Sequence, residues 1–155
     1  MSEDSLPYAT QGHYRTWFYF SITGVNKGET LTLSVRNMNN QGKLYKSDLK
    51  PVYRVLPNHQ KQWKRISNEV SYDYGTEGFY ITFMFQFNHD PSETAYFAFT
   101  YPYSFEASLR KSEQLYDRFR NHDIIYFHRE VLAYSLEQRP MELLTLTSYE
   151  KVDKS

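Results

Sequence analysis

The sequence contains no cysteine, which excludes disulfide bonds, thiolate zinc sites and cysteine nucleophiles. It also lacks an excess of either charge, because 18 Lys and Arg face 18 Asp and Glu. No long apolar run is present, and residues 1–4 lack the basic start of a signal peptide, so we expect neither a signal peptide nor a membrane span. These absences favour a soluble intracellular protein and make nucleic acid an unlikely partner.

Aromatic residues are what the sequence has in abundance. It carries 15 Tyr, 11 Phe and 2 Trp, about 18% of 155 residues, so we expect a core built from rings. A chain of this length forms one domain, or one and part of a second. It buries roughly two-thirds of its unfolded surface and needs no metal or disulfide to hold a core.

Residues 17–103 alternate between apolar and polar side chains with the period of β-strands. Phe79, Ile81, Phe83, Phe85 and Phe87 share one face, which predicts an inward row of rings. Strands are expected over 17–23, 30–38, 70–74, 79–88 and 94–101, with a tight loop at 75–78 and a hairpin closed by residues 89–92. The pattern is typical of an antiparallel β-sandwich, in a mainly β chain.

A different pattern begins after Tyr103. Leu109, Leu115 and Phe119 recur at helical spacing, with Ser104 placed to cap the helix and residues 121–123 to end it. Residues 124–136 and 141–147 are then predicted to form the two strands of a hairpin. We therefore expect a tail over 1–16, a sandwich over 17–103, a helix and hairpin over 104–149, and a tail over 150–155.

The sequence shows no complete catalytic constellation. Its five histidines have no metalloprotease spacing, and only His128 and Glu130 share a side of an expected strand. There is no nucleophile-elbow string and no glycine-rich phosphate loop. We therefore expect no catalytic residue, metal ligand or cofactor in this chain.

Charge is unevenly distributed along the chain. Residues 36–65 hold eight basic residues against Asp48, and residues 67–109 hold six acidic residues without Lys or Arg. The two blocks either face each other, form a dipolar surface for an acidic partner, or are ordinary solvated loops. The residues chosen as candidate contacts to an acidic substrate are Lys43, Lys46, Lys50, Arg54, Lys61, Lys64 and Arg65.

Exposed rings are a second kind of candidate site, because planar side chains on a sheet face stack sugars or bases. The candidates for exposure are Tyr53, Trp63, Tyr72, Tyr74 and Tyr80, although core packing is the commoner use of such residues.

Several strings, in order over residues 17–148, together resemble the N-terminal domain of the cytosolic carboxypeptidases. They are Trp17-Phe18-Tyr19-Phe20, Val35-Arg36-Asn37-Met38-Asn39, Lys43-Leu44-Tyr45, Lys50-Pro51-Val52, Trp63-Lys64-Arg65-Ile66, Tyr96-Phe97-Ala98-Phe99, Tyr101-Pro102-Tyr103-Ser104-Phe105 and Leu143-Leu144-Thr145-Leu146-Thr147-Ser148. The stretch over 126–136 is most similar to the member that removes branch-point glutamates. The residues taken as structural parts of the family motifs are Trp17, Tyr19, Asn37, Tyr45, Pro51, Trp63, Tyr101, Pro102 and Tyr103.

The resemblance implies a sandwich up to about Tyr103, followed by the opening helix and hairpin of an incomplete α/β carboxypeptidase domain. It implies a longer parent enzyme that uses zinc to trim glutamates from tubulin and other acidic protein tails, with its ligands after residue 148. The catalytic domain in cis and glutamate-rich tails are the implied partners, and the cytoplasm, near microtubules or cilia, is the implied location. Family members carry further strand-forming sequence before the Trp17 string, so a reduced sandwich edge is expected here.

The leading hypothesis is a noncatalytic accessory domain that braces the catalytic domain and attracts acidic substrate. One alternative is a stand-alone, aromatic-rich binding module for peptide or glycan. The other is a truncated peptidase relative that works only as an interaction protein.

Overall fold

The computed structural model of the chain describes residues 15–58, 60–76 and 78–151. Two compact units divide between Pro102 and Tyr103. The first unit holds two antiparallel sheets and the second a helix with a two-stranded hairpin. The prediction of a mainly β, antiparallel sandwich followed by a helix and hairpin is therefore confirmed.

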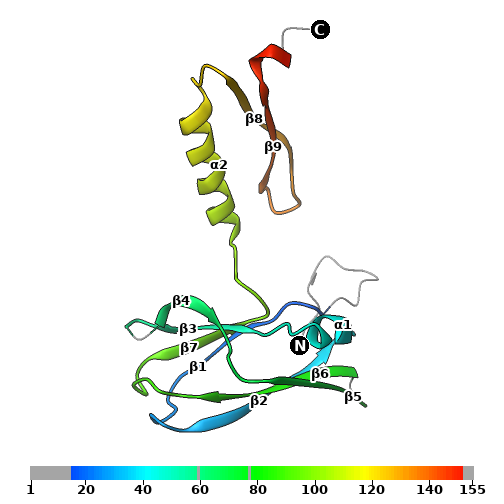
Figure 1. The fold of residues 1–155 in the computed structure, drawn as a ribbon, viewed down its shortest axis with the longest axis vertical. Coiled ribbons are helices and arrows are strands. Elements are labelled where there is room, and N and C mark those ends of the chain that lie inside the picture. The colour runs from blue at the N-terminus through cyan, green and yellow to red at the C-terminus, as the bar shows by residue number, and fades with distance from the viewer. Residues whose placement is uncertain (1–14, 59, 77, 152–155) are drawn as a thin grey trace. The chain divides into compact units, whose positions relative to one another are not determined.

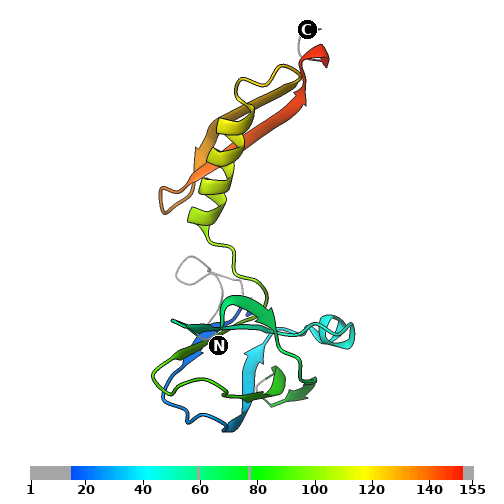
Figure 2. The ribbon, with the colours of Figure 1, turned by 60° about the vertical axis from the view of Figure 1, so that its left-hand side comes forward.

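The first unit is a sandwich of two sheets (Figure 1). Sheet A has the order β1 (Tyr19–Ile22), β7 (Thr94–Ala98), β3 (Val52–Leu56), β4 (Gln60–Arg65). Sheet B has the order β2 (Thr30–Met38), β6 (Gly78–Gln86), β5 (Val70–Gly75), and a short helix, α1 (Gly42–Lys46), follows β2. Figure 2 shows the same two layers from a second direction.

Aromatic rings fill the space between the sheets. Phe79, Phe83 and Phe87 are almost completely buried, whereas Met84 on the opposite face of β6 is 54% exposed. On sheet A, Phe97 of β7 lies 4.9 Å from Phe85, ring centre to ring centre, and 5.2 Å from Phe20. The inward row of rings predicted from the alternation is confirmed.

One prediction about this unit is wrong, and three elements were not predicted. Residues 89–92 do not close a hairpin, because β6 belongs to sheet B and β7 to sheet A. The Asp90 carboxylate accepts hydrogen bonds from the amide and hydroxyl of Ser92, and the Glu93 carboxylate accepts from the Asn58 amide at 2.9 Å. These bonds shape a loop that crosses from one sheet to the other.

The sequence analysis did not predict the strands over 52–56 and 60–65 or the helix over 42–46.

The second unit begins with α2 (Phe105–Phe119). Its amide at Ala107 donates to Ser104 Oγ at 3.1 Å, which confirms the predicted N-cap. The strands β8 (Ile125–Tyr134) and β9 (Pro140–Ser148) form the hairpin, and a 3-10 turn, η1 (Tyr149–Lys151), follows. The side chains of Phe119 and Phe127 pack helix against hairpin with ring centres 6.2 Å apart.

The expected tail over residues 1–16 falls mostly outside the described residues, as do residues 152–155. Arg15, at the start of the described chain, donates from Nε to the Asn37 carbonyl at 2.9 Å. Within the described residues, no helix combines the length and apolar character that crossing a bilayer requires.

Candidate functional site

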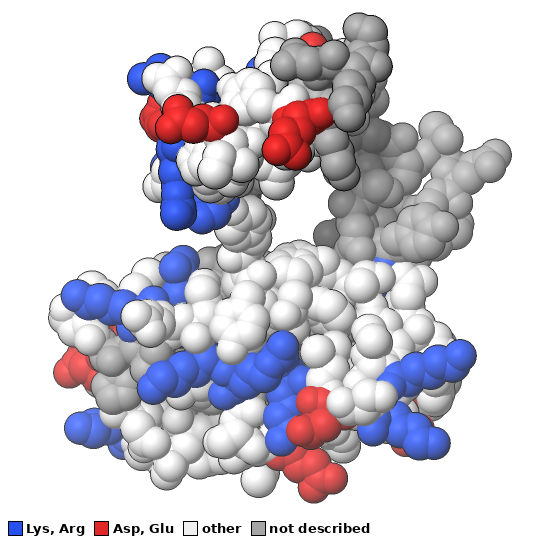
Figure 3. Space-filling model, turned by 45° about the horizontal axis from the view of Figure 1, so that its top comes forward, with Lys and Arg blue, Asp and Glu red and all other residues white. Residues whose placement is uncertain are grey.

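The structure brings most of the candidate basic residues to sheet A and to α1. Arg54 lies on β3, Lys61, Lys64 and Arg65 lie on β4, and Lys43 and Lys46 lie on α1. All are exposed except Arg54, which is half-buried. Figure 3 brings the sheet A side of the first unit forward, and Lys and Arg side chains spread across it.

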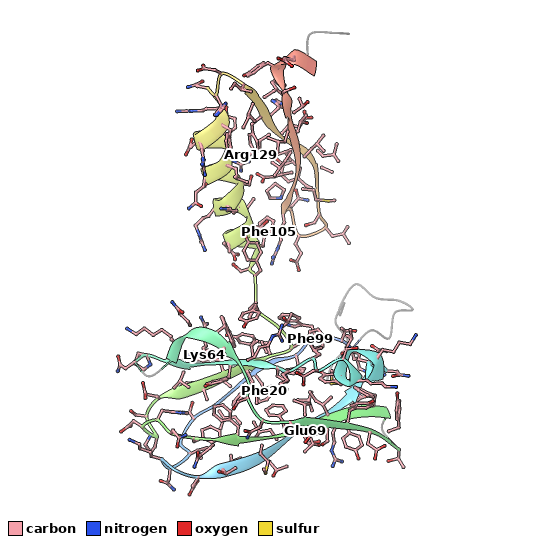
Figure 4. The ribbon with its side chains drawn as sticks, in the orientation of Figure 1. Phe20, Lys64, Glu69, Phe99, Phe105 and Arg129 are labelled. Atoms are coloured by element: carbon pink, nitrogen blue, oxygen red, sulfur yellow. The ribbon has the colours of Figure 1, made fainter. Side chains whose placement is uncertain are left out.

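The described residues of the acidic block are spread over several places: Asp90 and Glu93 lie in the loop before β7, and Glu106 lies on α2. Asp73 lies on β5 of sheet B and Glu69 directly before that strand. Figure 4 shows Lys64 and Glu69 on opposite layers of the sandwich. Among ion pairs formed between described residues, the basic block contributes only Lys50, whose Nζ lies 3.3 Å from Asp48 of the same block. No ion pair between described residues joins the two blocks, and most of the Lys and Arg side chains of the basic block lie on sheet A and α1.

Arg54 is held among three aromatic side chains on the outer face of sheet A. Its guanidinium carbon lies 4.8 Å from the centre of the Trp63 ring and 5.3 Å from that of Tyr96. An Nη2 hydrogen bond of 3.5 Å reaches the Tyr19 hydroxyl, and the Tyr19 ring lies 6.0 Å from Trp63. We call Tyr19, Arg54, Trp63 and Tyr96 the guanidinium cluster.

Arg65 extends this face. Its Nη1 donates to the Lys50 carbonyl at 2.7 Å, and its guanidinium carbon lies 5.3 Å from the Tyr101 ring centre. In the sheet register Arg65 pairs with Val52, which pairs in turn with Ala98. Val52 and Ala98 are completely buried, so outward-facing positions in the middle of the sheet are covered.

The family-motif residues of the first unit have structural explanations. Asn37 has φ 59°, at the irregularity of β2 between Val35 and Met38, and asparagine tolerates this left-handed conformation better than most residues. Tyr45 packs 5.8 Å from Phe79, ring centre to ring centre. Its hydroxyl is buried without a hydrogen-bond partner, and burial raises the pKa of the Tyr45 phenol.

The other motif residues lie at the edges of the sandwich and at the junction of the two units. Trp17 packs edge-on against Phe99 at 5.9 Å. Pro51 is fully buried, and its carbonyl accepts from the Ile66 amide at 3.0 Å. Pro102 is half-buried, and the Tyr103 hydroxyl donates to the Ala107 carbonyl at 3.4 Å within the second unit.

The five rings chosen from the sequence do not form one surface. Tyr53 lies 4.8 Å from Phe85 and Tyr72 lies 5.8 Å from Phe79, so both join the core. The Tyr74 hydroxyl bonds to Asn40 Oδ1 at 2.6 Å, and Tyr80 lies under Arg36. Of the five, only Trp63 belongs to the guanidinium cluster. The sequence prediction missed Tyr19 and Tyr96 as members of this cluster and Tyr101 as the ring beside Arg65. The alternation of Tyr19 with Phe18 and Phe20 was the signal that pointed to an outward Tyr19.

The polar residues of the second unit form a structural network. Arg129 of β8 donates from Nε to Glu142 of β9 at 2.7 Å, and Ser112 of α2 donates to the other carboxylate oxygen at 2.5 Å. Glu142 is largely buried. The Arg129 guanidinium, with a smaller contribution from the Ser112 hydroxyl, holds the pKa of the Glu142 carboxyl below its usual range.

Metal-binding residues are not assembled in the described part of the chain. His128 Nε2 lies 3.9 Å from Glu130, and both side chains are exposed. Across residues 15–58, 60–76 and 78–151, no three or more His, Asp or Glu side chains gather closely enough to hold a metal ion. His128 and Glu130 therefore form an exposed pair with no third ligand among these residues.

Comparison with known proteins identifies relatives of the chain. Residues 1–99 match the model of the cytosolic carboxypeptidase N-terminal domain. Cytosolic carboxypeptidase-like protein 5 of Homo sapiens is 37% identical over 142 residues, covering 86% of this chain and 16% of that protein. The protein of the same name from Danio rerio is 31% identical over 144 residues, covering 86% of this chain and 16% of that protein. Cytosolic carboxypeptidase 6 of Homo sapiens is 28% identical over 140 residues, with 87% and 26% covered.

One solved structure shares the fold. A metallo-carboxypeptidase from Burkholderia cenocepacia superposes with a TM-score of 0.54 at 21% identity, covering 86% of this chain and 31% of that one. The chain spans about 16% of the length of the type 5 relatives that it matches. Because the family model covers residues 1–99, the chain belongs to the cytosolic carboxypeptidase N-terminal domain family.

Proposed function

We propose that this chain is a noncatalytic accessory domain, with the first elements of the peptidase domain, of a zinc metallocarboxypeptidase. The enzyme removes glutamates from tubulin or other acidic protein tails in the cytoplasm, near microtubules or cilia. The finer placement next to members that remove branch-point glutamates is part of the same proposal. The match of residues 1–99 to the N-terminal domain of the cytosolic carboxypeptidases carries it.

The second unit supports the presence of a larger peptidase domain. Leu132, Leu136 and Leu146 of the hairpin region are 68%, 82% and 66% exposed. Soluble proteins rarely leave so much apolar surface in contact with water. Strands buried on both faces carry such residues, because helices cover both sides of a largely parallel sheet. We therefore infer that residues 104–149 open an α/β peptidase domain, which the sandwich of residues 17–103 braces.

In this proposal zinc binds to the catalytic domain of the full-length parent enzyme. We assign the metal and the catalytic residues to sequence after residue 148, as the family resemblance implies. No step of the reaction is assigned to residues of this chain.

Substrate recruitment is the role proposed for the basic block. Exposed ammonium groups such as those of Lys43, Lys46 and Lys64 raise the local concentration of an acidic peptide, and salt weakens this attraction. The contact set comprises Lys43, Lys46, Lys50, Arg54, Lys61, Lys64 and Arg65.

The test is a charge reversal in the full-length parent. We expect K43E, K46E, K64E and R65E together to lower kcat/KM on a glutamate-rich peptide by roughly tenfold at low salt, with the loss shrinking at high salt. A matched control reverses four exposed charges of α2 and its C-cap, Arg110, Lys111, Arg118 and Arg120. Unchanged turnover and unchanged salt dependence in the first variant would contradict recruitment by this block.

A second candidate function is an aromatic binding module. The clustering of Tyr19, Trp63 and Tyr96 on one outer face favours it. It predicts binding of an uncharged glycan or peptide that survives 1 M salt, whereas acidic-peptide binding does not.

A further inference from the structure

We propose that the pocket where β5 stops short of the end of β6 binds a short, uncharged, extended peptide segment of a partner protein. The segment adds a strand to sheet B by pairing with the main chain of Gln86. The pocket is separate from the guanidinium cluster, and it recognises its ligand by main-chain hydrogen bonds and apolar contacts rather than by charge. The inference therefore does not rest on the substrate proposed for the parent enzyme.

The edge of β6 that faces β5 is open at Gln86. The pairing of β5 with β6 ends at Val70 and Phe83, whereas β6 continues to Gln86. On the other edge, the Phe87 amide donates to the Glu29 carbonyl at 2.8 Å, toward β2. Main-chain groups of successive strand residues point to opposite edges, so those of Gln86 point away from β2. Hydrogen bonds between described residues do not engage the Gln86 amide or carbonyl.

A side chain already takes the place of a strand next to this open position. Asn68 Nδ2 donates to the Met84 carbonyl at 2.8 Å. Met84 is two residues before Gln86, so its carbonyl points to the same edge of β6. Asn68 thus supplies the amide that the main chain of a neighbouring strand supplies elsewhere in the sheet. It occupies the edge at Met84 and leaves the next position, at Gln86, to an incoming main chain.

The pocket beside Gln86 has room for such a segment. Its volume is about 230 Å³. A strand residue takes up roughly 160 Å³, from a rise of about 3.3 Å, a strand spacing of about 4.8 Å and a sheet spacing of about 10 Å. The pocket therefore holds one residue and part of the next. Val55, Ile66 and Phe85 are its buried lining residues, and Ser67 and Asn88 line it where it is exposed.

The pairing predicts which side chains the segment carries. The residue opposite Gln86 points outward, because directly opposed residues share a face of the sheet. Its two neighbours point to the other face, the one that carries Phe85. Among the described lining residues there is no Lys, Arg, Asp or Glu, and His89 is buried, so the pocket does not offset the cost of desolvating a charged ligand. We therefore expect a polar residue flanked by two apolar residues, with main-chain bonds giving affinity and the inward side chains giving selectivity.

The experiment titrates the isotope-labelled 155-residue chain with small probes and follows each backbone amide by NMR. The first probe is acetyl-Val-Thr-Val-amide, and the second is the same compound with an ester oxygen in place of the central N–H. We expect the first probe to shift the amides of residues 66–68 and 84–89, and the ester to bind at least fivefold more weakly. Acetyl-Glu-Thr-Glu-amide, which carries two negative charges, is also expected to bind at least fivefold more weakly.

Two variants at one position separate the main chain from the side chain. Gln86→Pro removes the amide N–H, and Gln86→Ala keeps it. Proline is tolerated in a strand where the N–H faces solvent, so we expect thermal unfolding of both variants close to that of the unaltered chain. Binding of the first probe should fall at least fivefold in Gln86→Pro and stay within twofold in Gln86→Ala. If the proline variant does not fold, the comparison of amide with ester on the unaltered chain decides the question.

Four results would overturn the site. They are the absence of shifts at residues 66–68 and 84–89 with millimolar first probe, shifts at Tyr19, Trp63 and Tyr96 instead, equal affinity for amide and ester, and equal losses in the two Gln86 variants. Shifts of the pocket amides by methyl glucoside, with none by the peptide, would assign the pocket to a sugar and overturn the peptide. The charge reversals in the parent enzyme test recruitment separately, so the two proposals can fail independently.

Discussion

Truncating Phe97 tests whether the ring core holds the sandwich together. This side chain is completely buried on β7, between β1 and β3. Its ring centre lies 4.9 Å from Phe85, 5.2 Å from Phe20 and 6.1 Å from Phe83. Phe97→Ala removes contacts to rings from both sheets and leaves a cavity that rigid strands cannot fill.

The expected loss is about 3–5 kcal/mol of unfolding free energy, the usual cost of deleting a buried phenyl group. A domain of this size has about 5–15 kcal/mol in total. With a urea slope of about 2 kcal/mol per molar, the midpoint falls by about 2 M. Urea titration followed by tryptophan fluorescence measures it, because Trp17 and Trp63 both lie on the first unit.

Two further variants keep the Phe97 experiment decisive. Phe97→Leu retains most of the apolar volume, so we expect it to lose less unfolding free energy than Phe97→Ala. It can still be measured if the alanine variant does not fold. Met84→Ala changes a side chain on the outer face of β6 that is 54% exposed, and we expect a change within about 0.5 kcal/mol. A loss below about 1 kcal/mol for Phe97→Ala would refute the assignment of this ring to the centre of the core.

Two other predictions concern local structure. Glu142→Gln removes the charge that accepts from Arg129 and Ser112. Because the folded-state pKa of Glu142 is lowered, its stabilisation is present above the unfolded pKa of about 4.3 and is lost as pH falls through the folded value. Hydrogen exchange of residues 125–148 should therefore be faster in the variant at pH 7 and converge with the unaltered chain at acidic pH; a constant difference would contradict this. At Asn37, where φ is 59°, alanine should cost about 1 kcal/mol more than glycine in urea midpoints, and equal costs would argue against a left-handed backbone there.

The parts of the fold that were predicted depend on local patterns. Phe79, Phe83 and Phe87 alternate with polar residues over a whole strand, so the period alone shows which face is inward. Ser104 precedes a helical pattern at the distance that a cap requires. Both features depend on residues that are close together in the sequence, and both are confirmed.

The missed strands lack such a pattern for physical reasons. In β3 the register shifts between Tyr53 and Val55, so burial no longer alternates along the sequence. β4 is an edge strand of polar residues around Trp63, and edge strands need little apolar surface. The turn at residues 89–92 has the chemistry of a hairpin, but local chemistry does not specify which sheet the next strand joins.

The guanidinium cluster could not be predicted from the sequence for the same reason. Arg54, Trp63 and Tyr96 come from three strands, two of which had not been predicted. The sequence showed a basic block, but only the sheet register places Arg54 between two rings and leaves Lys43 exposed on α1.

The central proposal is that this chain is the N-terminal part of a zinc carboxypeptidase whose zinc ligands follow residue 148. The most direct measurement is the coding sequence downstream of the Ser155 codon in the transcript. The account predicts an in-frame His-x-x-Glu string within several dozen codons. An authentic stop codon directly after Ser155 would contradict it, because a chain without those ligands has no peptidase domain to brace.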